Sequence, residues 1–149
     1  MKGEDMGRIG LMVLVGVFMT GCAGSPPFHL GLKNGRFAPC PDRDNCVSSQ
    51  SRDEKHRVAP LAYNESRESA LKHLKEVVQS MKRTRIVDES NDYLRVEFTS
   101  AVMGFVDDVE FYFPHEPIIH IKSASRIGYS DFGVNRKRVE KIRELFLKR

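Results

Sequence analysis

The sequence predicts an α+β domain in which helices cover one face of an antiparallel sheet of four to five strands. Two observations carry this prediction. The hydrophobic period is helical in the middle of the chain, alternates through four later stretches, and is helical again near the end. Short polar or proline-containing turns separate the alternating stretches, as is typical of antiparallel neighbours. The predicted element order is (β)-α-β-β-β-β-α.

The first helix is predicted over residues 65–81, because apolar residues recur there at helical spacing. They form a single stripe along the helix: Ala70, Leu71, Leu74, Val77, Val78 and Met81. We expect Asn64 to cap this helix, with Glu65 and Glu68 at the positive end of its dipole.

Four strands are predicted over residues 85–89, 93–99, 106–113 and 118–122. In the second of them Leu94, Val96 and Phe98 alternate with polar or amphipathic residues, so one face of the sheet should be buried. Residues 90–92 are expected to form a hairpin turn. Residues 56–59 are expected to add a short edge strand.

A second helix is predicted over residues 136–147, with four apolar side chains facing inward: Val139, Ile142, Leu145 and Phe146. Asn135 is the expected N-cap. Val134 and Val139 are placed to pack together as a hydrophobic staple around it.

The start of the chain has the form of a bacterial lipoprotein signal. Arg8 precedes an apolar run over residues 9–19, and the run ends in Met-Thr-Gly-Cys, of which Cys22 is the last residue. Eleven residues make a helix of about 16 Å, roughly half the thickness of a hydrocarbon core, so a signal sequence fits better than a membrane span. We expect Cys22 to carry lipid. An ordinary cleaved signal and an uncleaved apolar anchor are the alternatives.

Two details refine this prediction. Glu4 and Asp5 make the first segment less basic than the start of a signal peptide should be. An alternative hypothesis is that translation begins at Met6 and not at Met1. Ala23 follows the cysteine, where Asp is the familiar signal for retention in the inner membrane. We therefore expect a protein held by lipid in the outer membrane and facing the periplasm.

Three regions follow: a signal peptide over residues 1–21, a flexible tether over residues 22–39, and a single domain over residues 40–149. The tether is rich in Gly and Pro without a sustained hydrophobic period, and its reach is roughly 20–25 Å. The formal charge of +4 is mild, and the envelope compartment excludes nucleic acid as a partner. Basic residues gather in the last quarter of the chain, as an anion-binding patch or a solvated helix face.

Cys40 and Cys46 are the remaining cysteine pair once Cys22 is assigned to lipid, and a disulfide is the expected state in an oxidising compartment. A redox role is disfavoured because the spacing differs from Cys-x-x-Cys. Zinc is disfavoured because His115 and His120 do not complete a ligand set at suitable spacing. No cofactor and no metal are predicted.

Two segments resemble a known family. They are residues 40–49, Cys-Pro-Asp-Arg-Asp-Asn-Cys-Val-Ser-Ser, and residues 121–136, which run from Ile121 through a Gly-containing loop to Arg136. Both are similar to the signature segments of the domain of unknown function 1499 family, over about residues 39–147. The resemblance implies a domain found in bacteria and plastids, often with signal or membrane segments, and without an established activity. Asp44 departs from the proline that the family often has there.

The second of these segments is the candidate ligand site, because a strand, a glycine loop and a helix start follow one another and together suit an anion. The candidate residues are Ser123, Ser125, Arg126, Asp131, Asn135 and Arg136. The alternative is architectural: Asn135 caps the helix, and Asp131 pairs with Arg126 or Arg136 to fix the loop.

The expected function is therefore a non-enzymatic binding or structural module that takes an anionic ligand or an envelope partner. The alternative is a periplasmic enzyme using Asp108 and Glu110 with Arg126, since the two carboxylates share one face of a strand. Asp107 points to the opposite face and cannot join them. A polar, solvent-facing sheet surface explains the same carboxylates without any catalysis.

Overall fold

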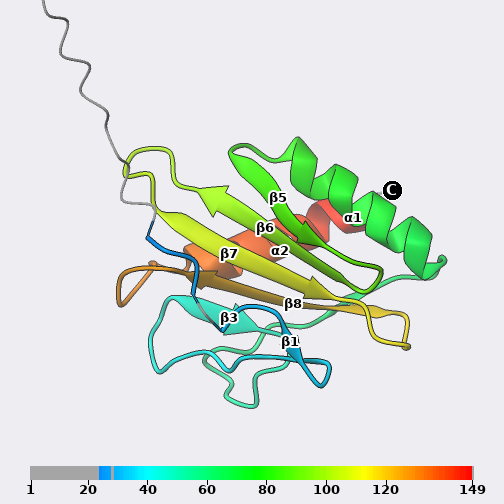
Figure 1. Cartoon of the computed structure of the whole chain (residues 1–149), viewed down its shortest axis with the longest axis horizontal. Coiled ribbons are helices and arrows are strands. Elements are labelled where there is room, and N and C mark those ends of the chain that lie inside the picture. Colours follow the sequence, from blue (N-terminus) through cyan, green and yellow to red (C-terminus); the bar gives the residue numbers. More distant parts are fainter. Residues whose placement is uncertain (1–23, 28, 149) are drawn as a thin grey trace, which may run out of the picture.

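An antiparallel sheet with two helices on one face frames the domain (Figure 1). The computed structural model describes residues 24–27 and 29–148, so the predicted signal peptide and the predicted lipidation site Cys22 lie outside the described residues. The elements follow in chain order: β1 (Leu32–Lys33), β2 (Arg36–Phe37), β3 (Cys46–Ser48), β4 (Leu61–Ala62), α1 (Arg67–Ser80), β5 (Thr84–Glu89), β6 (Tyr93–Thr99), β7 (Val106–Tyr112), β8 (Ile118–Ser125) and α2 (Val134–Leu147).

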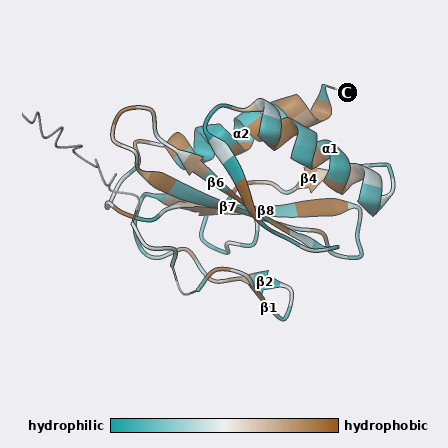
Figure 2. Cartoon of the chain, turned by 45° about the horizontal axis from the view of Figure 1, so that its top comes forward, coloured by the Kyte–Doolittle hydropathy of each residue, from teal (hydrophilic) through white to brown (hydrophobic). Residues whose placement is uncertain are grey.

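The main sheet has the strand order β3-β8-β7-β6-β5, and β4 also pairs with β8. All of these pairings are antiparallel, which confirms the predicted α+β class. Both helices cover the same face of the sheet, while the β1–β2 hairpin lies on the other side (Figure 2). The sheet is therefore covered on both faces, by helices on one and by the N-terminal segment on the other.

The hydrophobic core lies between the sheet and the helices. Alternation along β6 places Leu94, Val96 and Phe98 on the helix face, as predicted, and all three are buried. The helices bury Leu74 and Val78 from α1 and Val139, Ile142 and Phe146 from α2 against them. This face is the conventional apolar interior that holds the domain together.

Helix α1 begins later than predicted. Ser66 is the N-cap in place of Asn64, because its Oγ accepts the backbone N–H of Ser69 at 3.1 Å. The helix ends at Ser80 with Met81 as the C-cap. The predicted apolar stripe is otherwise correct, with His73 also buried on it.

The strands differ from the prediction mainly at their ends. β8 continues to Ser125, three residues further than predicted, because Ser123 and Ala124 pair with β3. The edge strand predicted over residues 56–59 is wrong: Arg57 forms only an isolated bridge with Ser48, and the short strand near this point is β4.

The start of helix α2 also corrects the prediction. The helix begins at Val134, with Gly133 as its N-cap in the left-handed conformation at φ +79°. Asn135 is therefore a buried residue inside the first turn and not a cap. Val134 is the first residue of the helix and does not precede the cap, so it is not in the position that the predicted staple with Val139 requires. Asp131 supplies the capping oxygens, accepting the N–H groups of Gly133 and Asn135, each at 2.8 Å.

The segment predicted to be a tether is folded over the sheet from Gly24 onward. The β1–β2 hairpin lies within it, Phe37 is buried, and the Phe37 N–H donates to Gln50 Oε1 at 2.9 Å. Periodicity missed this segment because its strands have two residues each. Among the described residues, no helix combines the length and the apolar character needed to cross a bilayer.

Candidate functional site

Charged side chains gather on the face of the sheet that points away from the helices. Alternation along β7 sends Asp107 to the helix face and Asp108 with Glu110 to the opposite face, as the sequence predicts. Residues of β5, β6 and β8, together with Arg126 directly after β8, complete the group. We call this set the charged face: Arg85, Arg95, Glu97, Asp108, Glu110, Lys122 and Arg126.

The alternative explanation of Asp108 and Glu110 as part of a solvent-facing surface is wrong. Asp108 is 2% exposed and Glu110 is 1% exposed, because the N-terminal segment lies across them. Burying an unpaired carboxylate costs free energy, so the partners of Asp108 and Glu110 determine which chemical roles are open to them.

Arg126 stands at the centre of one half of the charged face. Its Nε donates to Asp108 Oδ2 at 2.7 Å and its Nη2 donates to Asp108 Oδ1 at 3.0 Å. Its Nη2 also pairs with Glu97 Oε1. Arg95 donates to Asp108 Oδ1 at 3.1 Å, and Arg85 donates to Glu97 Oε2 at 2.7 Å. Both carboxylates are thus held by two guanidinium groups each.

These contacts shift the pKa values of Glu97 and Arg126. Burial raises the pKa of Glu97, but the hydrogen bonds from Arg85 and Arg126 outweigh it and hold the pKa below its ordinary value. The hydrogen bond to Asp108 raises the pKa of Arg126, burial opposes this, and the bond to Glu97 adds to it. Glu97 is therefore locked as an anion and Arg126 as a cation.

The other half of the charged face is centred on Glu110. Its Oε1 accepts the hydroxyl of Tyr93 at 2.9 Å and the backbone N–H of Gly31 at 2.7 Å, which ties the N-terminal segment to the sheet. Burial, and then the neighbouring Glu110, raise the pKa of Tyr93, so its hydroxyl stays protonated as a donor.

Lys122 is 2% exposed, and its Nζ lies 3.5 Å from Glu110 Oε2, beyond normal hydrogen-bond distance. An ammonium can donate three hydrogen bonds, so this cation is weakly satisfied by the described residues.

A cavity of about 360 Å³ opens beside Lys122, between the charged face and the segments that cover it. Lys122, Asp108 and Arg126 belong to its sheet side, and Arg43 and Asn45 line it from the disulfide-bonded loop. The N-terminal segment supplies the remaining wall through Ser25, Pro27, His29 and Leu30. The volume is near the lower end of the range for small-molecule sites.

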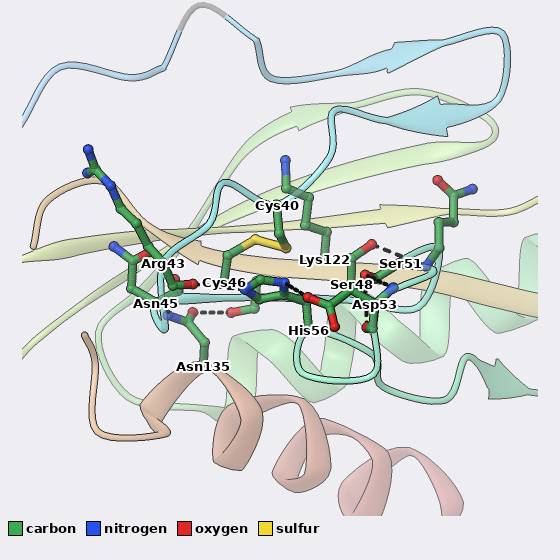
Figure 3. Close-up of a disulfide and its surroundings, with 12 residues drawn as sticks. Cys40, Arg43, Asn45, Cys46, Ser48, Ser51, Asp53, His56, Lys122 and Asn135 are labelled. Atoms are coloured by element: carbon green, nitrogen blue, oxygen red, sulfur yellow. Dashed lines mark hydrogen bonds and ion pairs between the residues drawn. A yellow bond between two sulfur atoms is a disulfide. The ribbon is translucent and has the colours of Figure 1, made fainter. Parts of the chain in front are cut away.

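On the helix face of the sheet, Asn135 joins three parts of the chain. Its Nδ2 donates to the carbonyl of Asn45 at 3.1 Å and to Ser125 Oγ at 2.9 Å, and its Oδ1 accepts Ser123 Oγ–H at 2.5 Å. Arg138 donates to the same Oδ1 at 2.7 Å. Figure 3 shows Asn135 and Lys122 on opposite sides of β8. The Asn135 cluster is architectural.

The remaining predicted residues also bind protein groups. Arg136 donates to the carbonyls of Lys55 and Arg57, both at 2.7 Å. Asp131 occupies the N–H groups at the start of α2 that an anion would otherwise use. Among the described residues, Asp131 forms no ion pair with Arg126 or Arg136. The predicted pairing of Asp131 with one of these arginines is therefore wrong. The structure thus divides the six predicted residues, and brings only Ser125 and Arg126 to the cavity beside Lys122.

Cys40 and Cys46 form the predicted disulfide, with their α-carbons 5.6 Å apart (Figure 3). It closes the loop that carries Arg43 and Asn45 to the cavity. Sequence reasoning missed the neighbouring pair of His56 and Asp53, where Nδ1 lies 2.9 Å from Oδ2. The spacing of three residues between Asp53 and His56 was the only sign of this pair in the sequence. The other nitrogen, Nε2, lies 2.9 Å from the carbonyl of Arg43 and not beside a hydroxyl, so the pair does not form a catalytic triad.

Comparison with known families places the two signature segments within one domain. The model for the family described as "Protein of unknown function (DUF1499)" matches residues 36–146, from the start of β2 into the last turn of α2. The chain belongs to the DUF1499 family. No curated protein matches it. The DUF1499 match includes the whole charged face, the disulfide and the Asn135 cluster, and it begins inside the hairpin that covers the charged face. In the described part of the chain no group of three or more His, Cys, Asp or Glu side chains is placed to hold a metal ion.

Proposed function

We propose that this protein is a lipid-anchored component of the bacterial cell envelope, held through Cys22 in the outer membrane and facing the periplasm. Its DUF1499 domain is a non-enzymatic module that binds an anionic group, carried by a small ligand or by an envelope partner, in the cavity beside Lys122. The observation that carries this proposal is the weakly satisfied, buried ammonium of Lys122 in the wall of that cavity.

Charge supports an anion at this place. The charged face holds four cationic side chains, Arg85, Arg95, Lys122 and Arg126, against the three carboxylates Glu97, Asp108 and Glu110. Arg43 adds a further cation at the cavity. An anion near Lys122 Nζ would supply the acceptors that Glu110 alone does not provide.

The enzymatic alternative, with Asp108 and Glu110 as acid and base beside Arg126, has less support. Asp108 has both oxygens engaged by guanidinium groups, and Glu110 accepts two hydrogen bonds and faces Lys122. A general acid or base exchanges a proton with its substrate through a carboxylate oxygen, and these contacts already occupy the oxygens of both groups. The same contacts hold both side chains in place, which suits the wall of a rigid binding site.

The experiment is a thermal melting series of the mature protein in rising inorganic phosphate, with chloride used to keep the ionic strength constant. At ten times its dissociation constant, phosphate should stabilise the folded state by about 1.4 kcal/mol, which raises the melting temperature by about 5 °C. Lys122→Met keeps the length of the side chain but removes the ammonium, so it should abolish this increase.

Lys137→Gln is the matched control, because Lys137 is an exposed cation on α2 away from the cavity lining. It should keep the full phosphate effect. The anion proposal fails if phosphate does not raise the melting temperature of the wild type above the chloride series, or if Lys122→Met keeps the increase.

A further inference from the structure

Large apolar side chains are exposed mainly at one end of the domain. Among the described residues, those most exposed are Val102, Met103, Ile127, Tyr129, Phe132, Val134 and Leu147. All except Leu147 belong to the β6–β7 connection (residues 100–105), to the β8–α2 connection (residues 126–133), or to the first residue of α2. A cluster of this kind on a monomer indicates a contact surface.

The sheet brings these two connections together. Thr99 at the end of β6 pairs with Val106 at the start of β7, and Asp107 pairs with Ser125 at the end of β8. Both connections therefore leave the sheet from the same end. Figure 1 shows them at the left of the molecule, and Figure 2 colours the β6–β7 connection as hydrophobic. We call this end of the domain the loop end.

The described chain also begins at the loop end. The carbonyl of Gly24 accepts Arg126 Nη1 at 3.3 Å, and a Cβ added to Gly24 would lie 3.3 Å from Ile127 Cγ2. One residue, Ala23, separates Gly24 from Cys22, so the two α-carbons are at most about 7 Å apart. A lipid on Cys22 would hold the loop end at the membrane surface and leave no long tether between them.

We propose that the loop end docks on the lipid bilayer, with Val102, Met103 and Phe132 inserted at the interface. This inference rests on the proposed lipid anchor at Cys22, and it adds a second, non-covalent contact that fixes the orientation of the domain. The cavity beside Lys122 then opens close to the membrane, because Arg126 lines the cavity and also contacts Gly24.

Phe132 supports this assignment independently of the lipid. Its φ of +54° is uncommon for a bulky residue, and its side chain is 90% exposed. The residue thus combines an unfavourable backbone conformation with an unburied aromatic ring. Backbone strain of this kind clusters at functional positions, which favours a role for the exposed ring of Phe132.

Charge at the loop end also suits a bilayer with anionic headgroups. Lys82 and Arg83 are exposed next to the β6–β7 connection, where Arg83 Nε donates to the carbonyl of Thr99 at 3.0 Å. The nearby acidic groups Asp42 and Asp44 are paired with Lys55. Basic residues beside inserted apolar side chains are typical of proteins that lie on membranes.

Tryptophan fluorescence tests the orientation, because the chain contains no Trp. The lipidated protein carrying Phe132→Trp is reconstituted into vesicles of phosphatidylethanolamine and phosphatidylglycerol with brominated acyl chains. We expect its emission to shift to shorter wavelength and the brominated lipid to quench most of it. The matched control is Leu147→Trp, which is exposed at the other end of α2, about 20 Å away, and should be neither shifted nor quenched.

The outcomes separate this inference from the anchor. If mass spectrometry shows lipid on Cys22 but Phe132→Trp is not quenched, the docking orientation is wrong and the anchor stands. Equal quenching of Phe132→Trp and Leu147→Trp also overturns the orientation. An unmodified Cys22 overturns both the proposed anchor and this inference.

Discussion

Arg126 illustrates how one side chain can belong both to a candidate site and to the architecture. It pairs with Asp108 and Glu97, contacts the N-terminal segment at Gly24, and lines the cavity beside Lys122. The sequence singled out Arg126 as a candidate residue and considered Asp131, a free anion, and Asp108 with Glu110 as its partners. The pairing with Glu97 was not foreseen, because the register of neighbouring strands is not visible in local periodicity.

Glu97 gives a prediction about acid stability. Its pKa is lower in the folded state than the ordinary value of 4.5, so the unfolded chain binds the proton more tightly. The stabilisation from this group is complete above its unfolded pKa and is lost as the pH falls through 4.5 and below. Glu97→Gln should reduce the free energy of unfolding at neutral pH by about 2 kcal/mol and flatten this acid dependence.

Urea unfolding between pH 7 and acid conditions measures this effect. Glu54→Gln is the control, because the side chain of Glu54 is 92% exposed and should change neither the stability nor its pH dependence appreciably. A Glu97→Gln variant with the same acid dependence as the wild type would show that Glu97 is not the group responsible.

At the scale of elements, the Asn135 cluster fastens α2 to β8 and to the disulfide-bonded loop. Its bonds reach Ser123 and Ser125 in β8 and the carbonyl of Asn45 beside Cys46. This cluster explains why the two signature segments, far apart in the sequence, occur together: they form one contact. It also explains why the second segment resembles an anion loop, since Asp131 supplies the anion from within the chain.

Removing Asn135 should therefore be costly. Asn135→Ala leaves several buried partners without hydrogen bonds, so we expect a loss of about 2–4 kcal/mol in the free energy of unfolding. Lys137→Ala, an exposed change two residues further along the same helix, should cost less than about 0.5 kcal/mol. Chemical unfolding followed by circular dichroism compares the two. A small loss for Asn135→Ala would mean that the cluster does not stabilise the fold.

Most of the elements were predictable because each has a strong period of its own. β6, with Leu94, Val96 and Phe98 on one face, was predicted with correct ends, and α1 is shorter than predicted by two residues at its start and one at its end. The edges were less predictable. β3 and β4 have three and two residues, and both are strands only because β8 offers them a partner. Periodicity also identifies an apolar face without telling what covers the polar one, so the sequence could not tell that Asp108 and Glu110 are buried.

At the scale of the whole molecule, the N-terminal segment changes the expected arrangement. A tether over residues 22–39 would let the domain stand away from the membrane, whereas the folded segment leaves only one residue, Ala23, between Gly24 and Cys22. The segment also covers the charged face through the bond from the Gly31 N–H to Glu110. A lipid on Cys22 would therefore make the proposed anchor a neighbour of the cavity and the loop end, so lipidation of Cys22 determines whether this arrangement has a function.

The intact mass of the protein extracted from the bacterial envelope tests this most directly. We predict a polypeptide that begins at Cys22 and carries the additional mass of a diacylglyceryl group and an amide-linked acyl chain. In Cys22→Ser this addition should be absent and the protein should leave the membrane fraction. A wild-type mass without lipid, or a Cys22→Ser variant that stays in the membrane with the same mass increment, would contradict the lipid-anchored function.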